Sequence, residues 1–364
     1  MNGVEYLYLY PNWRVKADLK SLADLESYEA FTCVTGDGKV NGAATGIDRD
    51  AEGRARYSWK RGATRLSPGR IPELISAGKL KPGESWMQVH DFESGETVGA
   101  ARGSVSWNGF RQRWIMIVSG RPGEVWFAEG DTPSGPWIYA RRVVSHDHYN
   151  FYNPTQHPFF DQDGGRLIYF EGTYTAAFST AKQKTPRYDY NQIMYRLALD
   201  DARLNLPVPV YRVNDAGRKT RYLTREAIER EQLWNQIEAV AFFALAPGRG
   251  RGGMIPIFEQ KEGGQALLRD TPSRGNAQPI FFALPPRGRP VESPSGPTED
   301  QSSAVVPLFE YRHVQSGRRT YSTNPEPADQ TLQRPVEPVC RVWHNPMSAL
   351  ILDPDAKPVP LARE

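Results

Sequence analysis

Short runs of apolar and aromatic residues, separated by turn residues, fill most of the chain. The clearest are 111–118 (RQRWIMIV), 124–130 (EVWFAEG) and 166–175 (RLIYFEGTYT), which are rich in aromatic and β-branched residues. Gly, Pro and Asp stand between such runs, a pattern typical of antiparallel strands joined by loops. The pattern predicts an all-β chain with one short helix at 71–80, between a Pro near its start and a Gly near its end.

The strands of the first 200 residues recur with a period of about 50 residues, after an insertion in the first copy. Equivalent positions are held by 4–10, 112–118 and 166–172, each followed by a second strand at 28–34, 124–130 and 192–199. A repeat of this size indicates β-propeller blades. A closed propeller needs about four blades or more, and these residues supply roughly two and a half. We therefore expect either further blades downstream or a missing segment ahead of the chain.

A second repeat follows downstream, with a different signature. Its three copies begin at 207–213 (PVPVYRV), 254–260 (MIPIFEQ) and 306–312 (VPLFEYR), and each leads into a Gly turn and a polar strand. Each copy then reaches a further apolar strand: AFFAL, IFFAL or VCRVW. Three such copies indicate internal threefold pseudosymmetry, for which a β-trefoil-like module is the natural closed arrangement. Three further propeller blades are the alternative.

These repeats define the expected domains. Propeller blades, with the N-terminal blades missing, are expected over 1–206, a three-repeat β module over 207–346 and a tail over 347–364. We favour a separate module because the Trp-rich strand pairs disappear and the connecting loops become long and rich in Gly, Arg and Pro.

Composition narrows the class of protein further. The 364 residues are 39% hydrophobic, which is enough for real cores, and the net charge of +3 predicts no nucleic-acid partner. Cys33 and Cys340 lie at opposite ends of the chain and form neither a metal-ligand spacing nor a disulfide framework. The chain has no apolar run long enough to span a membrane. It has no signal-peptide pattern at its start, so export is expected only if residues precede Met1.

Most enzyme motifs are absent from the sequence. The chain has no G-x-S-x-G elbow, no phosphate-binding G-x-x-x-x-G-K-[ST] loop and no C-x-x-C pair. His146 and His148 stand two residues apart, but no third metal ligand with a sensible spacing accompanies them. We therefore expect no metal and no cofactor, and oligomeric state is left open.

Three segments resemble a known propeller family. RGSVSWNGFRQRWIMI (102–117), GEVWFAEGDTPSGPW (123–137) and YNPTQHPFFDQDGGRLIYFEGTYT (152–175) are similar to its carboxyl-terminal blades. The family was long catalogued as of unknown function, some of its relatives are endo-acting arabinanases, and its fold resembles five-bladed furanosidase propellers. The resemblance covers roughly residues 1–210, and it implies a carbohydrate-active, glycoside hydrolase-like protein that binds polysaccharide or oligosaccharide. Residues 220–245 more weakly resemble a short repeat module appended to secreted hydrolases.

Glycosidic cleavage uses two carboxyl groups, one as acid and one as base or nucleophile. Glu171 is the candidate acid, because flanking aromatic residues in its strand would desolvate it and raise its pKa. Asp189 is the candidate base or sugar-hydroxyl acceptor. The structural alternatives are an ion pair with an Arg of a neighbouring blade for Glu171 and a turn cap for Asp189. Glu129 and Asp131 precede a turn that the resemblance treats as a structural element.

Several polar and aromatic residues are candidates for substrate binding. Asn153 occupies the blade-opening position at which the family pattern has an acidic residue, and His157 follows at the inner end of the same blade. The flat faces of Trp and Tyr side chains stack on sugar rings, although most propeller tryptophans belong to the core. The aromatic candidates are Trp107, Trp126, Tyr152 and Tyr174, with Trp137 as a further one.

Three interpretations follow from the sequence. The first is a glycoside hydrolase-like propeller with acid and base carboxylates in an axial pocket. The second is a noncatalytic glycan-binding or scaffold protein of the same architecture, and the third is a propeller that binds proteins. Two carboxylates facing one pocket would favour the first over the second. Exposed aromatic residues in that pocket would favour both over the third.

Overall fold

The structure, a computed structural model, describes residues 4–10, 12–35, 39–63, 65–100, 102–146, 148–176, 179, 190–215, 219–273, 275, 277–286, 302–326, 329–333 and 337–353. The chain forms two compact units. The N-terminal unit comprises Met1–His90, Thr97–Asp200 and Pro346–Glu364, and the C-terminal unit comprises Asp91–Glu96 and Asp201–Asn345. Both consist mainly of antiparallel sheets, which confirms the all-β prediction.

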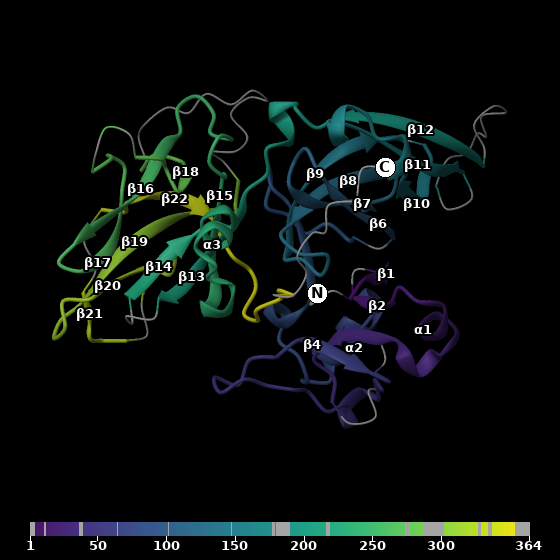
Figure 1. Ribbon diagram of the computed structural model, residues 1–364, viewed down its shortest axis with the longest axis horizontal. Helices are drawn as coiled ribbons and strands as arrows, with labels where there is room; N and C mark the ends of the chain where they lie inside the picture. The colour runs from purple at the N-terminus through teal and green to yellow at the C-terminus, as the bar shows by residue number, and fades with distance from the viewer. Residues whose placement is uncertain are drawn as a thin grey trace. The chain divides into compact units, whose positions relative to one another are not determined.

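The described residues of the N-terminal unit form three sheets (Figure 1). In the first and third sheets, all strands that follow one another in the chain lie side by side, whereas in the second sheet the earliest strand pairs with the last one. The first sheet has the order β1-β2-β3-β4, the second β5-β9-β8-β7-β6 and the third β10-β11-β12. Their bounds are β1 Tyr6–Tyr10, β2 Trp13–Lys16, β3 Glu29–Thr32, β4 Ser58–Arg61, β5 Met87–Asp91, β6 Gly103–Asn108, β7 Arg113–Ser119, β8 Glu124–Gly130, β9 Trp137–Ser145, β10 Asn150–Gln156, β11 Leu167–Thr175 and β12 Asn191–Ala198.

The hydrophobic pattern of the second sheet reflects burial of both its faces. Ile115, Met116, Ile117 and Val118 of β7 are all at most 2% exposed, and every residue of β8 is buried. A strand that is covered on both faces has no need for polar residues at alternate positions, so it reads as a continuous apolar run. This explains why these two strands were the easiest to predict.

Other elements differ from the sequence-based prediction. The expected helix is present as α2 (Ile71–Ser76), with a Pro in its first turn. The short strands β2 and β10 and the helices α1 (Leu19–Ala23) and α3 (Arg225–Glu231) were not expected. The proposed equivalence of 4–10 with β7 and β11 is not matched in the described sheets, because β1 lies at a sheet edge whereas β7 and β11 are inner strands.

The end of the described chain packs into the N-terminal unit rather than forming a free tail. Ile351 is fully buried, and Asp353 is 1% exposed. The Asp353 carboxylate accepts a hydrogen bond from Trp59 Nε1 at 2.8 Å and pairs with Arg14, whose Nη1 lies 3.5 Å away. Because a buried carboxylate is costly unless it is paired and hydrogen-bonded, this contact fixes the segment within the unit.

The C-terminal unit repeats one arrangement three times (Figure 1). In each repeat, a long first strand pairs with a second strand along one edge and with a third strand along the other. The first strands are β13 Val208–Asp215, β16 Ile255–Glu262 and β19 Val305–His313. The second strands are β14 Lys219–Leu223, β17 Gln265–Arg269 and β20 Arg319–Ser322, and the third are β15 Ile237–Ala244, β18 Phe281–Ala283 and β22 Cys340–Trp343; β21 (Leu332–Gln333) also pairs with β19.

Matching residues of the three repeats meet in one hydrophobic core. In this core, Val210 lies opposite Phe242, Ile257 opposite Phe281 and Leu308 opposite Cys340, and all six are fully buried. The third strands also contact one another, through backbone pairings of Phe243 with Trp343, Leu245 with Phe282 and Leu284 with Arg341. The three repeats therefore share a single core.

Two tyrosine hydroxyls connect the repeats within this core. Tyr222, Leu268 and Tyr321 hold matching positions on the second strands. The Tyr321 backbone N–H donates to the Tyr222 hydroxyl at 2.8 Å, and the Leu268 backbone N–H donates to the Tyr321 hydroxyl at 2.9 Å. Each tyrosine thus satisfies a buried donor of another repeat, and Leu268 offers no hydroxyl for a third such bond.

We expect Tyr222→Phe to lower the free energy of unfolding of the C-terminal unit by about 1–3 kcal/mol, because it leaves the buried Tyr321 N–H without its acceptor. Chemical denaturation followed by fluorescence measures the change. Tyr195→Phe is the matched control, since the described structure gives the Tyr195 hydroxyl no hydrogen-bond partner. Equal losses in the two variants would show that the connecting hydrogen bond contributes nothing.

Candidate functional site

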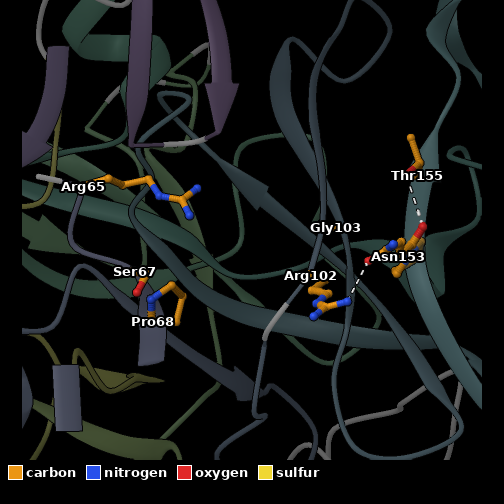
Figure 2. Close-up of a pocket in the computed structure, with 8 residues that line it drawn as sticks. Arg65, Ser67, Pro68, Arg102, Gly103, Asn153 and Thr155 are labelled. Carbon is orange, nitrogen blue, oxygen red and sulfur yellow. Dashed lines mark hydrogen bonds between the residues drawn. The ribbon is translucent and has the colours of Figure 1, made fainter. Parts of the chain in front are cut away.

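A pocket of about 530 Å³ opens in the N-terminal unit (Figure 2). One part of its wall comes from the loop that precedes α2, another from the start of β6 and a third from the middle of β10. The lining residues are Arg65, Ser67, Pro68, Arg102, Gly103, Asn153, Pro154 and Thr155. A cavity of this size is within the range of small-molecule sites.

A β-bulge in β10 shapes one wall of the pocket. Tyr152 lies opposite Thr173 and Thr155 lies opposite Glu171, so β10 carries one more residue than β11 between these two pairings. Asn153, inside the bulge, has a φ of 51°, in the left-handed region that Asn tolerates better than most residues. The bulge brings Asn153, Pro154 and Thr155 together at the cavity.

Arg102 is positioned by contacts to its backbone and to its side chain. Its N–H donates to Ser119 Oγ at 3.3 Å, and Ser119 Oγ donates back to the Arg102 carbonyl oxygen at 3.1 Å. Its guanidinium donates from Nη1 to Asn153 Oδ1 at 3.3 Å and lies 5.6 Å from the centre of the Tyr152 ring. Gly103 follows, and any side chain there would collide with the β7 backbone at Ile117.

The pocket lining is positively charged. Figure 2 shows Arg65, Ser67 and Pro68 on one side and Arg102, Asn153 and Thr155 on the other. The eight lining residues include two arginines and no Asp or Glu. The remaining polar groups, from Ser67, Asn153 and Thr155, are neutral donors and acceptors.

Glu171 and His157 form a pair beside this pocket. His157 Nε2 lies 3.2 Å from Glu171 Oε1, and the two side chains are 20% and 29% exposed. Directly opposite residues of an antiparallel pair point to the same face of the sheet, so the Glu171 side chain is a neighbour of Thr155 in the pocket wall. Two of the predicted site residues are therefore in contact, and a third, Asn153, lies in the adjoining wall.

Exposed aromatic residues gather on the third sheet and around it. Tyr152 and Tyr190 lie with ring centres 6.5 Å apart, and the nearby Tyr152 hydroxyl raises the pKa of Tyr190. Phe159 and Phe160, just after β10, are 76% and 49% exposed. Of these four residues the sequence analysis identified only Tyr152, since the others lie in turns outside the strand pattern.

The other aromatic candidates are less accessible. Trp126 and Trp137 are at most 1% exposed, so protein covers both faces of each ring. Tyr174 is 4% exposed and stacks on Tyr149, and its hydroxyl contacts the His146 ring. Trp107 is half-buried against Trp114, with ring centres 5.8 Å apart. Tyr152 is therefore the aromatic candidate that lies beside the pocket.

The remaining acidic candidates lie apart from the pocket lining. Glu129 pairs with Arg111 at 2.7 Å and Asp131 pairs with Arg113, all four being at most 9% exposed. These buried pairs support the structural role expected for the turn that follows. Asp189 lies outside the residues that the structure describes.

Asp161 has a raised pKa, which the sequence did not predict. Its carboxylate accepts a hydrogen bond from Gln156 Nε2 at 3.1 Å, and partial burial raises its pKa. A carboxyl group of raised pKa keeps its proton to higher pH, which is a requirement for a general acid. It is the C-cap residue of the short 3-10 helix Pro158–Phe160, which follows β10, and lies four residues after His157 in the chain.

Comparisons with protein-family models, curated proteins and solved structures found no match for this chain. No helix in the described part of the chain is long and apolar enough to cross a membrane. Among the same residues, no group of three or more His, Cys, Asp and Glu side chains is arranged to hold a metal ion. Chemistry at the pocket must therefore be inferred from its own side chains.

We expect Asp131→Asn to destabilise the N-terminal unit by about 3–5 kcal/mol, because it leaves the buried Arg113 without its counter-charge. Thermal unfolding measures the effect. Asp200→Asn removes a carboxylate that is 48% exposed and pairs with Arg166 at the surface, so it should cost less than about 1 kcal/mol. A stable Asp131→Asn variant would contradict a structural role for this pair.

Proposed function

We propose that this chain binds carbohydrate through the pocket of the N-terminal unit, as a glycan-binding protein of the glycoside hydrolase-like propeller class. The single observation that carries the proposal is the pocket itself, a cavity of about 530 Å³ with Arg, Ser, Asn and Thr side chains in its wall. Sugar hydroxyls both donate and accept hydrogen bonds, and this set of side chains offers partners for both.

Aromatic residues beside the pocket support the same proposal. The Tyr152 ring lies next to Arg102, and Tyr190 is 64% exposed close to Tyr152. Exposed rings offer the flat apolar faces on which sugar rings stack. The contact of the Tyr152 ring with Arg102, a lining residue, favours a ligand in the pocket over a protein partner, which would use a broader patch of apolar residues.

Binding is favoured over hydrolysis by the charge of the lining. Hydrolysis of a glycosidic bond needs two carboxyl groups about 5–10 Å apart across the scissile bond. The lining contains none, and the adjacent Glu171 is paired with His157. A glycoside hydrolase remains the second candidate, because Glu171 neighbours Thr155 in the wall.

The architecture that we propose is a partial five-bladed β-propeller followed by a β-trefoil-like module. The three described N-terminal sheets, in which most consecutive strands lie side by side, support the assignment to blades. The three C-terminal repeats with one shared core support the trefoil-like arrangement. Small-angle scattering of the full chain would distinguish a ring of sheets from an open row.

We expect the full chain to bind polysaccharide, in affinity gel electrophoresis against a panel of neutral and acidic glycans that includes debranched arabinan. Thr155→Val removes a hydroxyl from the wall while keeping its shape, so binding should weaken about two- to tenfold, the effect of one hydrogen bond of about 0.5–1.5 kcal/mol. Thr331→Val, at an exposed position of the C-terminal unit, is the control. Absence of binding to every glycan would refute the proposed function.

If the second candidate is correct, Glu171→Gln abolishes turnover of the bound glycan and leaves folding and binding intact. Release of reducing ends measures turnover. Glu238→Gln changes a similarly exposed strand carboxylate that pairs with Arg212 in the other unit, and it should leave turnover unchanged. Retained turnover in Glu171→Gln would remove Glu171 from the catalytic candidates.

A further inference from the structure

We infer that the pocket recognises an acidic sugar unit, whose anionic group binds at the Arg102 guanidinium. This inference rests on the proposed function and specifies its ligand class. It depends on the charge of the wall, because the described residues that line the cavity include two arginines and no acidic side chain. An anion in the cavity gains charge-assisted hydrogen bonds from a guanidinium group.

The contacts of Arg102 leave it suited to this role. Its guanidinium donates one hydrogen bond, from Nη1 to the neutral Asn153 amide oxygen, and it forms no ion pair with any described carboxylate. A guanidinium has five N–H donors in a planar fork, so most of them remain for a ligand. A carboxylate or sulfate oxygen pair matches this fork.

The surroundings of Arg102 restrict its position before any ligand arrives. Ser119 holds its backbone in both directions, Asn153 holds its side chain and the Tyr152 ring lies beside its guanidinium. Asn153 is itself fixed by the bulge, in a backbone conformation that only a few residue types accept readily. Such preorganisation lowers the entropy lost on binding.

The neutral groups of the wall fit the rest of the same ligand. Ser67 lies on the side of Arg65, and Asn153 and Thr155 lie on the side of Arg102 (Figure 2). With an acid group held at Arg102, these side chains offer hydrogen-bond partners to the ring hydroxyls of the same sugar. Arginine in the wall therefore recognises the anionic group of the ligand, and the neutral side chains recognise its sugar hydroxyls.

The test compares the full-length protein and its Arg102→Gln variant in calorimetric titrations. The probes are polygalacturonate, its methyl ester, dextran sulfate, debranched arabinan and polyglutamate. We expect polygalacturonate or dextran sulfate to bind more tightly than the neutral probes, and that preference to fall at least tenfold in Arg102→Gln and with added salt. Arg230→Gln, an exposed arginine on α3 of the other unit, removes the same charge and should change nothing.

Each outcome decides one point. If Arg102→Gln loses only polygalacturonate binding, the recognised anion is a carboxylate. If it loses only dextran sulfate binding, the recognised anion is a sulfate. Equal binding of acidic and neutral glycans, unchanged by Arg102→Gln, overturns this inference but keeps the proposed function. Polyglutamate binding as tight as that of the glycans overturns the sugar assignment, and no binding of any glycan overturns both.

The variant itself must remain folded for this comparison. Arg102 is exposed, so Arg102→Gln should keep the circular dichroism spectrum and melting temperature of the parent. Arg102→Lys provides a second variant, which keeps the charge and loses the planar fork. We expect it to bind the acidic glycan more tightly than Arg102→Gln and more weakly than the parent. Parental affinity in both variants would exclude Arg102 from the site.

Discussion

One extra residue in β10, relative to its partner β11, determines how the candidate site is built. Without the bulge at Asn153 and Pro154, strict alternation would carry Thr155 to the opposite face of the sheet from Glu171. With it, Thr155 and Glu171 are cross-strand neighbours and Asn153 reaches Arg102. The pocket wall, the Glu171–His157 pair and the position of the guanidinium all depend on this irregularity in strand pairing.

How far the sequence could predict this arrangement varies between the elements. The strands β7 and β8 were predictable because both their faces are buried and their residues form apolar runs. The short strand β2 was missed because four residues carry too little periodicity. The bulge was missed because Asn-Pro also reads as the start of a turn.

The same limits apply to the candidate site. Glu171 and His157 could be identified because the segment that contains them resembles a known pattern. The structure brings the two side chains into contact. Arg102 and Arg65 carry no such signal, since one precedes a strand and the other stands in a loop. Only the fold brings them to one cavity, because they are 37 residues apart in the chain. Trp126 and Trp137 were candidates by residue type, but both rings are covered by protein. Residue type alone does not reveal which rings are covered.

The hydroxyls of Tyr222 and Tyr321 have a consequence for how the C-terminal unit arose and how it folds. Each accepts a backbone N–H that belongs to a different repeat, so a single repeat in isolation would leave its own donors and core residues exposed. The repeats are therefore not autonomous folding units, and the unit should assemble in one cooperative step. If the unit arose by duplication of this segment, a stable protein would result only once three copies were present. Selection would then act on the three copies together rather than on a single copy.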